Sequence, residues 1–128
     1  MIWKLLLTLL LHGRVCVASV FGYPGDQWAG GKACCIGRRV RPGDVGIAHR
    51  TLPCGTRVAL MNPRTWRVIV AEVVDRGPYG ARMADGTWGL KMARRDPGRW
   101  RGCIDLTPAA AEALDHDGFE RVIYTVIE

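Results

Sequence analysis

The sequence has little of what would carry it across a membrane or leave it disordered. Its compact apolar run, Leu5 to Leu11, is much shorter than the roughly twenty residues that a membrane-spanning helix needs. The chain contains no internal repeat and no low-complexity tract, and hydrophobic residues make up 48% of it and charged residues 23%. These proportions argue against disorder, and a length of 128 residues predicts one compact domain.

Acidic residues are scarce relative to basic ones. The chain has 18 Lys and Arg against 12 Asp and Glu, a formal charge of +6 at pH 7. Such an excess suits a polyanionic partner, namely nucleic acid, an anionic membrane or a bacterial cell wall. Nucleic acid is the least favoured of the three, because the basic residues are scattered and an exported disulfide protein rarely meets DNA.

The N-terminal segment has the pattern of an export signal. Lys4 supplies a short positive region, Leu5 to Leu11 an apolar region, and Cys16-Val17-Ala18 places small residues where a signal peptidase reads them. We expect cleavage after Ala18, so that residues 1–18 are a signal peptide. The alternative is an uncleaved, membrane-associated leader, because His12 to Arg14 interrupt the apolar run.

Export would place the mature protein in the periplasm or outside the cell at the cell wall. We expect a monomer with no stable membrane insertion after cleavage. Loss of Lys4 and Arg14 would leave 16 basic against 12 acidic residues, a charge of +4.

The cysteines predict disulfides and not a metal site. After the leader is removed an even number remains in an oxidising compartment: Cys34, Cys35, Cys54 and Cys103. Because the adjacent Cys34 and Cys35 do not easily bridge each other, we expect one to reach Cys54 and the other Cys103. Each bridge should contribute roughly 2–4 kcal/mol. A zinc site is disfavoured, because the cysteines lack paired short spacings and no histidine completes a ligand pattern.

The most informative strand runs from Val68 to Val74 and ends in Asp75-Arg76-Gly77-Pro78-Tyr79. Its β-branched residues favour a strand, and Gly77 and Pro78 end it in a turn. A carboxylate and a guanidinium are therefore delivered to the rim of a sheet, where binding groups can reach a ligand. The simpler interpretation is that Asp75 caps the turn and pairs with Arg76.

The remaining pattern predicts an all-β fold, mainly β with one short helix. Short strands are expected over residues 45–49, 56–61, 66–74, 103–106 and 122–127. Thr107 as N-cap and Pro108 at the first position begin the one predicted helix. Many short strands and one helix predict a small, disulfide-stabilised closed barrel over residues 45–128, preceded by an arm or edge segment over residues 19–44.

A long loop, Gly80 to Gly102, carries Trp88, Trp100 and several basic residues. Loops of this length are more often functional than idle, and the tryptophans could stack on sugar rings. The alternative is that both tryptophans pin the loop to the barrel wall.

Three sequence blocks stand in order along the chain: Ala48 to Val58 (AHRTLPCGTRV), Val74 to Tyr79 (VDRGPY) and Ile104 to Ala111 (IDLTPAAA). Together they resemble the RlpA-like double-psi β-barrel domain, which is shared with bacterial septal-ring lytic transglycosylases and, more distantly, with expansins and barwin-type proteins. The resemblance covers residues 45–126 and implies a six-stranded barrel with an open groove for a glycan.

The resemblance also implies a substrate and a reaction. The relatives cleave peptidoglycan between N-acetylmuramic acid and N-acetylglucosamine and form an anhydro sugar without consuming water, and neither a cofactor nor a metal is implied. Matching the blocks residue by residue marks His49, Asp75 and Asp105 as catalytic candidates. The residues expected to bind substrate are Thr51, Arg76, Tyr79, Trp88 and Trp100.

The chemistry suits those candidates. One carboxylic acid can protonate the leaving oxygen and then, as carboxylate, take the proton of the hydroxyl that closes the ring, while a second steadies the positive charge on the sugar. We predict Asp105 or Asp75 as acid/base, with His49 hydrogen-bonding one of them or the substrate. Each has a simpler alternative: a groove-wall histidine for His49, and capping of the helix entry for Asp105.

The chain departs from the family in one segment. Septal transglycosylases usually carry an acidic segment ahead of the histidine block, whereas residues 36–43 here are basic and only Asp44 is acidic. Three functions therefore stay open: a lytic transglycosylase, a non-catalytic expansin-like module that binds cell-wall glycan, and a secreted interaction or inhibitor protein built on the same scaffold.

Overall fold

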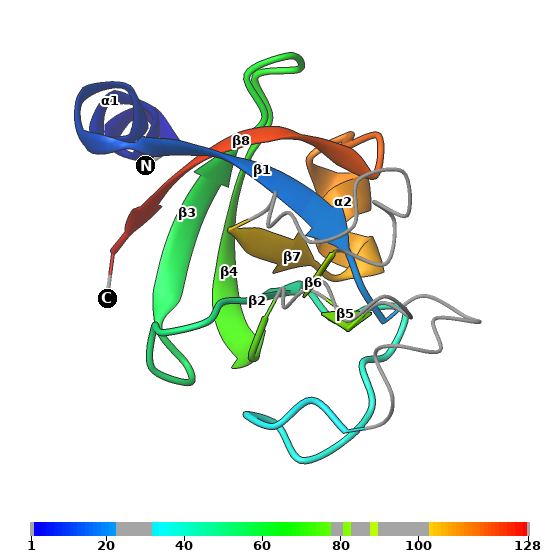
Figure 1. Cartoon of the computed structure of the whole chain (residues 1–128). Helices are drawn as coiled ribbons and strands as arrows, with labels where there is room; N and C mark the ends of the chain where they lie inside the picture. Colours follow the sequence, from blue (N-terminus) through cyan, green and yellow to red (C-terminus); the bar gives the residue numbers. More distant parts are fainter. Residues whose placement is uncertain (1, 23–31, 78–80, 83–87, 90–102, 128) are drawn as a thin grey trace.

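The computed structural model describes residues 2–22, 32–77, 81–82, 88–89 and 103–127, and within them six strands close into a barrel (Figure 1). Around the barrel the strands follow the order β1 (Arg14–Val20), β7 (Ile104–Leu106), β2 (Gly46–Ala48), β4 (Val68–Asp75), β3 (Arg57–Met61) and β8 (Phe119–Val126). Helix α1 (Ile2–His12), helix α2 (Pro108–Ala113) and a small sheet of β5 (Ala81–Arg82) and β6 (Trp88–Gly89) complete the described elements. The predicted fold, mainly β with a closed six-stranded barrel, is confirmed.

Two strand pairs in the barrel are parallel. β1 runs parallel to β7 and β2 parallel to β4, while the other neighbours are antiparallel. Parallel partners cannot be joined by a tight hairpin. Segments that are distant in the sequence therefore meet side by side, and this brings the chain's N-terminal strand next to β7.

The barrel interior is filled by aliphatic side chains that alternate along the strands. Those that are fully buried include Ile47, Val58, Leu60, Val73, Ile104, Leu106 and Val122. A second cluster lies outside the barrel, where Leu9 of α1 packs on Ala59 and Met61 of β3. β8 is covered on both faces, since Val122 packs in the barrel core and Ile123 packs in the cluster with α1.

The predicted helix entry is present in full. Thr107 is the N-cap of α2 and accepts from the Ala110 amide at 3.3 Å, and Pro108 occupies the first turn. The Thr107 hydroxyl also accepts from the Gly46 amide at 3.0 Å, so the cap ties α2 to β2. Helix α2 is thereby fixed against the strand that precedes His49.

The barrel in the structure includes a strand that lies before its predicted N-terminal boundary. β1 begins at Arg14, inside the expected signal peptide, and pairs with both β7 and β8. Residues 19–44 are accordingly not a separate arm, since β1 continues to Val20 and is part of the barrel. Cleavage after Ala18, whose side chain is fully buried in the core, would cut through this strand.

The cysteine pairing also needs a correction. The disulfides are Cys16–Cys103 and Cys35–Cys54, with Cα atoms 5.9 and 5.3 Å apart, and Cys34 is a free, exposed thiol. The pairing of Cys35 with Cys54 is one of the two pairings that were predicted for Cys54. Cys103 takes Cys16 in place of Cys34, because β1 lies beside β7 and the Cys103 amide donates to Val17 O at 3.0 Å.

None of the helices in the described part of the chain has the length and apolar character needed to cross a bilayer.

Candidate active site

A row of paired residues crosses four neighbouring strands of the barrel. Ser19 of β1 pairs with Asp105 of β7, Asp105 pairs with Ala48 of β2, and Ala48 pairs with Asp75 of β4. The register shifts between Ile47 and Ala48, which sets the last residue of β4 opposite Ala48. The two predicted carboxylates therefore lie on either side of one small, buried residue.

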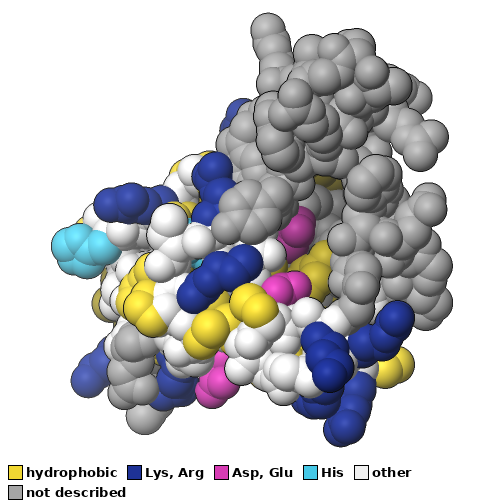
Figure 2. All heavy atoms as spheres, turned by 60° about the horizontal axis from the view of Figure 1, so that its bottom comes forward, with side chains coloured by type: hydrophobic (Ala, Val, Ile, Leu, Met, Phe, Trp, Pro, Cys, Tyr) yellow, Lys and Arg dark blue, Asp and Glu magenta, His cyan; other side chains and the backbone are white. Residues whose placement is uncertain are grey.

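The backbones of Asp75 and Asp105 are separated by two strand spacings, about 10 Å. Both residues are half-buried. Figure 2, which looks at the end of the barrel toward which β4 runs, shows acidic side chains in a hollow near the middle of the face with basic side chains around it. That Asp75 and Asp105 act together as a carboxylate pair stays a prediction.

Asp105 is held by a serine that the sequence did not single out. The Ser19 hydroxyl, only 7% exposed, donates a short hydrogen bond to Asp105 Oδ1. A hydroxyl can donate or accept. This contact is therefore compatible with either protonation state of Asp105, which an acid/base residue must alternate between.

Asp75 is held by the backbone of the segment before β2. Its Oδ1 accepts from the Cys34 amide at 3.0 Å, while its carbonyl accepts from the His49 amide at 3.1 Å. Next to it, the Cys35 amide donates to Val74 O at 3.0 Å, and the Cys35–Cys54 disulfide anchors the same segment. The simpler expectation, a turn cap that pairs with Arg76, does not describe these contacts.

His49 directly follows Ala48, and its ring nitrogen Nδ1 is occupied. Nδ1 accepts from the amides of Thr51 and Leu52 at 3.2 and 3.1 Å. Burial, followed by the charges of Arg50 and Arg76, lowers the pKa of His49. The neutral ring then carries its proton on Nε2, so His49 offers a hydrogen-bond donor and not a base.

Arg76 braces the turn that holds His49. Its Nη1 donates to His49 O at 3.1 Å and to Leu52 O at 2.5 Å, and its Nη2 lies 3.6 Å from Cys54 Sγ. The guanidinium thus holds the segment from His49 to Cys54 in place, and its predicted contact with substrate stays a prediction.

The chain shares sequence with known proteins over about half of its length. No family model matches it. Over 63 residues it is 43% identical to the probable endolytic peptidoglycan transglycosylase RlpA of Nostoc sp. (strain PCC 7120), which covers 49% of this chain and 16% of that protein. The proteins of the same name from Synechocystis sp. (strain PCC 6803) and Aquifex aeolicus are 38% and 37% identical, over 60% and 52% of this chain and 23% and 30% of theirs.

The chain is similar to RlpA proteins over about half of its length, and its closed six-stranded barrel fits the predicted RlpA-like fold. The closed six-stranded topology and these identities agree with the three sequence blocks. The chain spans less than a third of the length of those three curated relatives.

The structure describes only some of the other residues that are predicted to bind substrate. Thr51 is exposed beside His49. Trp88 lies in β6, where its backbone pairs with Arg82. Tyr79 and Trp100 lie outside the described residues.

The family's missing acidic segment is not replaced by Asp44. Its carboxylate receives two bonds from the Arg38 guanidinium, at 2.7 and 3.1 Å, and a third from the Arg41 amide at 2.7 Å. The Arg38 hydrogen bond, supported by that of Arg41, lowers the pKa of Asp44 to about 2. Asp44 is therefore a structural anion and unsuited to donate a proton near neutral pH.

One cluster of metal-type ligands occurs in the described part of the domain: His116, Asp117 and Glu120, whose ligand atoms lie within 4.8 Å of one another. These atoms serve the turn into β8. His116 Nδ1 accepts from Gly118 N, Asp117 Oδ1 accepts from Phe119 N, and Glu120 binds Arg64 and Asn62. The cluster has a structural explanation and needs no ion.

Proposed function

We propose that this chain is an exported lytic transglycosylase that cleaves the glycosidic bond between N-acetylmuramic acid and N-acetylglucosamine in peptidoglycan. The observation that carries the proposal is the pairing of Asp105 and Asp75 across Ala48 in an RlpA-like barrel. The curated relatives are named for action on peptidoglycan, which supports the substrate class.

In the proposed mechanism Asp105 is the acid/base. It protonates the oxygen that leaves the muramic acid ring as the glycosidic C–O bond breaks. The carboxylate so formed takes the proton from a hydroxyl of the same sugar, whose oxygen closes on the ring carbon and gives the anhydro sugar. The proton returns to Asp105 and no water is consumed.

Asp75 and His49 support that step in different ways. Asp75 faces the positive charge that develops on the sugar ring, and its bond from the Cys34 amide keeps it oriented. His49 donates from Nε2 to a substrate oxygen, because its Nδ1 is committed to the backbone.

A second function is favoured by a specific observation. Residues 36–43 are basic and Asp44 is bound to Arg38, so the acid that septal transglycosylases carry in this segment has no counterpart here. A barrel that binds the cell wall without cleaving it, as an expansin-like module, fits that loss.

The test is mass spectrometry of the soluble products after the oxidised chain is incubated with purified peptidoglycan, intact or stripped of its peptides by an amidase. Anhydro-muropeptides or anhydro-glycans that disappear in Asp105→Asn and Asp75→Asn establish the transglycosylase. Asp115→Asn is the matched control, because Asp115 is exposed and has a positive φ of 51°, which asparagine tolerates. Absence of products while the protein still sediments with the wall would establish the binding module.

A further inference from the structure

The segment from Lys32 to Asp44 forms a basic loop. It lies next to the carboxylate row, the line of paired residues Ser19, Asp105, Ala48 and Asp75. It carries four basic residues, Lys32, Arg38, Arg39 and Arg41, against the single acid Asp44, a net charge of +3 over thirteen residues. The loop contacts residues in the carboxylate row and residues next to it. Its Cys34 amide binds Asp75, and its Ile36 and Val40 pack on Phe21, Ala48 and Val74.

The loop is held in one conformation by several independent contacts. The backbones of Ala33 and Arg38 form an isolated antiparallel β-bridge, and the Cys35–Cys54 disulfide joins the loop to the turn after His49. Arg38 binds Asp44 through both of its terminal nitrogens, Nη1 and Nη2. A charged surface that is fixed before a ligand arrives loses less conformational entropy on binding.

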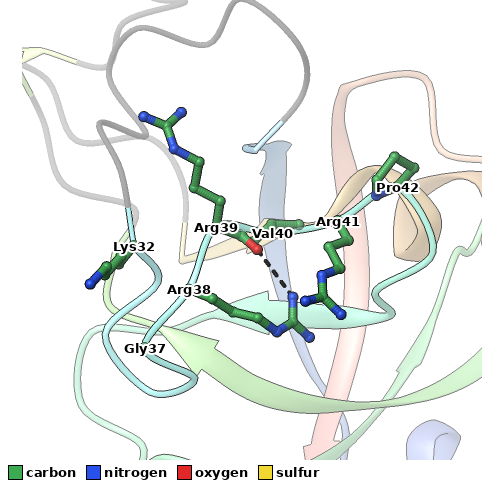
Figure 3. A pocket seen from close by; sticks show the side chains of 7 residues that line it. All are labelled: Lys32, Gly37, Arg38, Arg39, Val40, Arg41 and Pro42. Carbon is green, nitrogen blue, oxygen red and sulfur yellow. Dashed lines mark hydrogen bonds between the residues drawn. The ribbon is translucent and has the colours of Figure 1, made fainter.

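This loop borders an open surface pocket of about 510 Å³, lined by Lys32, Gly37, Arg38, Arg39, Val40, Arg41 and Pro42. Figure 3 shows the guanidinium groups of Arg38 and Arg41 close to each other, while Lys32 and Arg39 point away from them. Asp44 neutralises one of the two converging guanidiniums. Within residues 32–77 and the other described ranges, neither Arg39 nor Arg41 has a carboxylate at ion-pair distance, and both are exposed.

We infer that this basic pocket binds a carboxylate carried by the cell-wall polymer. Guanidinium groups match the planar, two-oxygen geometry of carboxylates, and charge-assisted bonds of this kind are stronger than neutral ones. A glycan strand lying over the carboxylate row would bring its substituents to the loop, since Cys34 and Val40 lie at the row itself. The carboxylate is either the lactyl group of a muramic acid stripped of its peptide or an acid of the attached peptide. The inference takes its ligand from the proposed function but concerns binding and not cleavage.

The experiment measures equilibrium binding of the full oxidised chain, in an Asp105→Asn background so that glycan is not consumed. The probes are amidase-stripped glycan strands, the same strands with their carboxylates converted to methylamides, and fragments that keep their peptides. We expect amidation to weaken binding about tenfold, and Arg39→Gln with Arg41→Gln to weaken binding to the carboxylate probes by a similar factor while leaving the methylamide probe unaffected.

The matched control is Arg67→Gln with Arg121→Gln, which removes the same charge from exposed positions on the β3–β4 turn and β8. An equal loss in both double variants, or no effect of amidation, would overturn the inference and leave only general electrostatic attraction. Tighter binding of stripped strands identifies the lactyl carboxylate as the ligand, and tighter binding of peptide-bearing fragments identifies the peptide acid.

Failure of this inference and failure of the proposed function are separable. If the chain with Asp105 intact makes anhydro products equally from the natural and methylamidated strands, the enzyme stands and the pocket does not. If no products form from any probe but binding depends on the carboxylate and on Arg39 and Arg41, the pocket stands without the enzyme.

Discussion

The domain has two groups of carboxylates with different partners. At the turn into β8, Glu120 accepts from Arg64 and Asn62, and the Arg64 hydrogen bond lowers its pKa to about 2. In the row across the barrel, Asp75 and Asp105 receive bonds from a backbone amide and a serine hydroxyl. The arginine-bound carboxylate ties the turn into β8 to the β3–β4 turn, whereas the carboxylates of the row are bonded along the line of strands that carries the proposed site.

The strongest test of this comparison removes the acid in the row. Asp105→Asn should lower the rate of anhydro-product formation by about 10²- to 10⁴-fold, because asparagine cannot deliver a proton. The thermal unfolding midpoint should change little, since asparagine can still accept from Ser19. A retained rate would exclude Asp105 as the acid.

Loss of the Cys16–Cys103 disulfide should destabilise the barrel that carries both groups of carboxylates. Cys16→Ser removes the link between β1 and β7 and should cost about 2–5 kcal/mol in free energy of unfolding, measured by chemical denaturation. Cys34→Ser is the control, because that thiol is free and exposed, and should leave stability within about 0.5 kcal/mol. Equal stability of the two variants would contradict the pairing of Cys16.

A smaller effect is expected when the arginine-bound carboxylate is neutralised. Glu120→Gln should lower the free energy of unfolding by about 1–3 kcal/mol, because Arg64 and the buried Asn62 amide lose a charged acceptor. Product formation per folded molecule should stay near its original rate. If activity fell as far as in Asp105→Asn, the division into structural and chemical carboxylates would be wrong.

The arginine-bound carboxylates and His49 should lose their contributions to stability in different pH ranges. Glu120 and Asp44 have lowered pKa values, so the stability they contribute is present above their ordinary range near 4 and is lost as the pH falls toward about 2. His49 acts in a higher window. Its pKa is below 6.5, so stability declines as the pH falls below 6.5, where the unfolded chain takes up a proton and the folded ring does not.

Protonation of Nδ1 would also break its two bonds from Thr51 and Leu52. Activity is therefore expected to fall at mildly acidic pH, before the steep loss of stability that follows protonation of Glu120. Parallel curves of product formation and unfolding midpoint between pH 3 and pH 8 measure this order. In His49→Gln the separate loss of activity at mildly acidic pH should vanish.

Much of the site could be predicted because its residues end strands with clear patterns. The valines before Asp75 and the Thr107-Pro108 helix start after Asp105 have local physical causes, and both are present in the structure. Their spatial relation came from the family resemblance. Sequence periodicity does not reveal which parallel strands become neighbours.

The errors share one physical origin at the N-terminus. Small and β-branched residues before and at Ala18 satisfy a signal peptidase and a buried barrel strand equally well, so the leader pattern concealed β1. Because β1 was not recognised, neither Ser19 nor Cys16 was assigned a partner. The Cys34 contact to Asp75 uses a backbone amide, which any residue would supply and no side-chain pattern can indicate.

The parallel pairing of β1 with β7 has a consequence for when the contact between Ser19 and Asp105 can form. Ser19 and Asp105 are 86 positions apart, and they meet only after the barrel has closed and brought Cys16 to Cys103. The entropic cost of closing a loop of this length falls on the folding of the whole barrel, because no local turn brings these residues together. The hydrogen bond to Asp105 is therefore a marker of complete folding, absent from any fragment that lacks either end of the barrel.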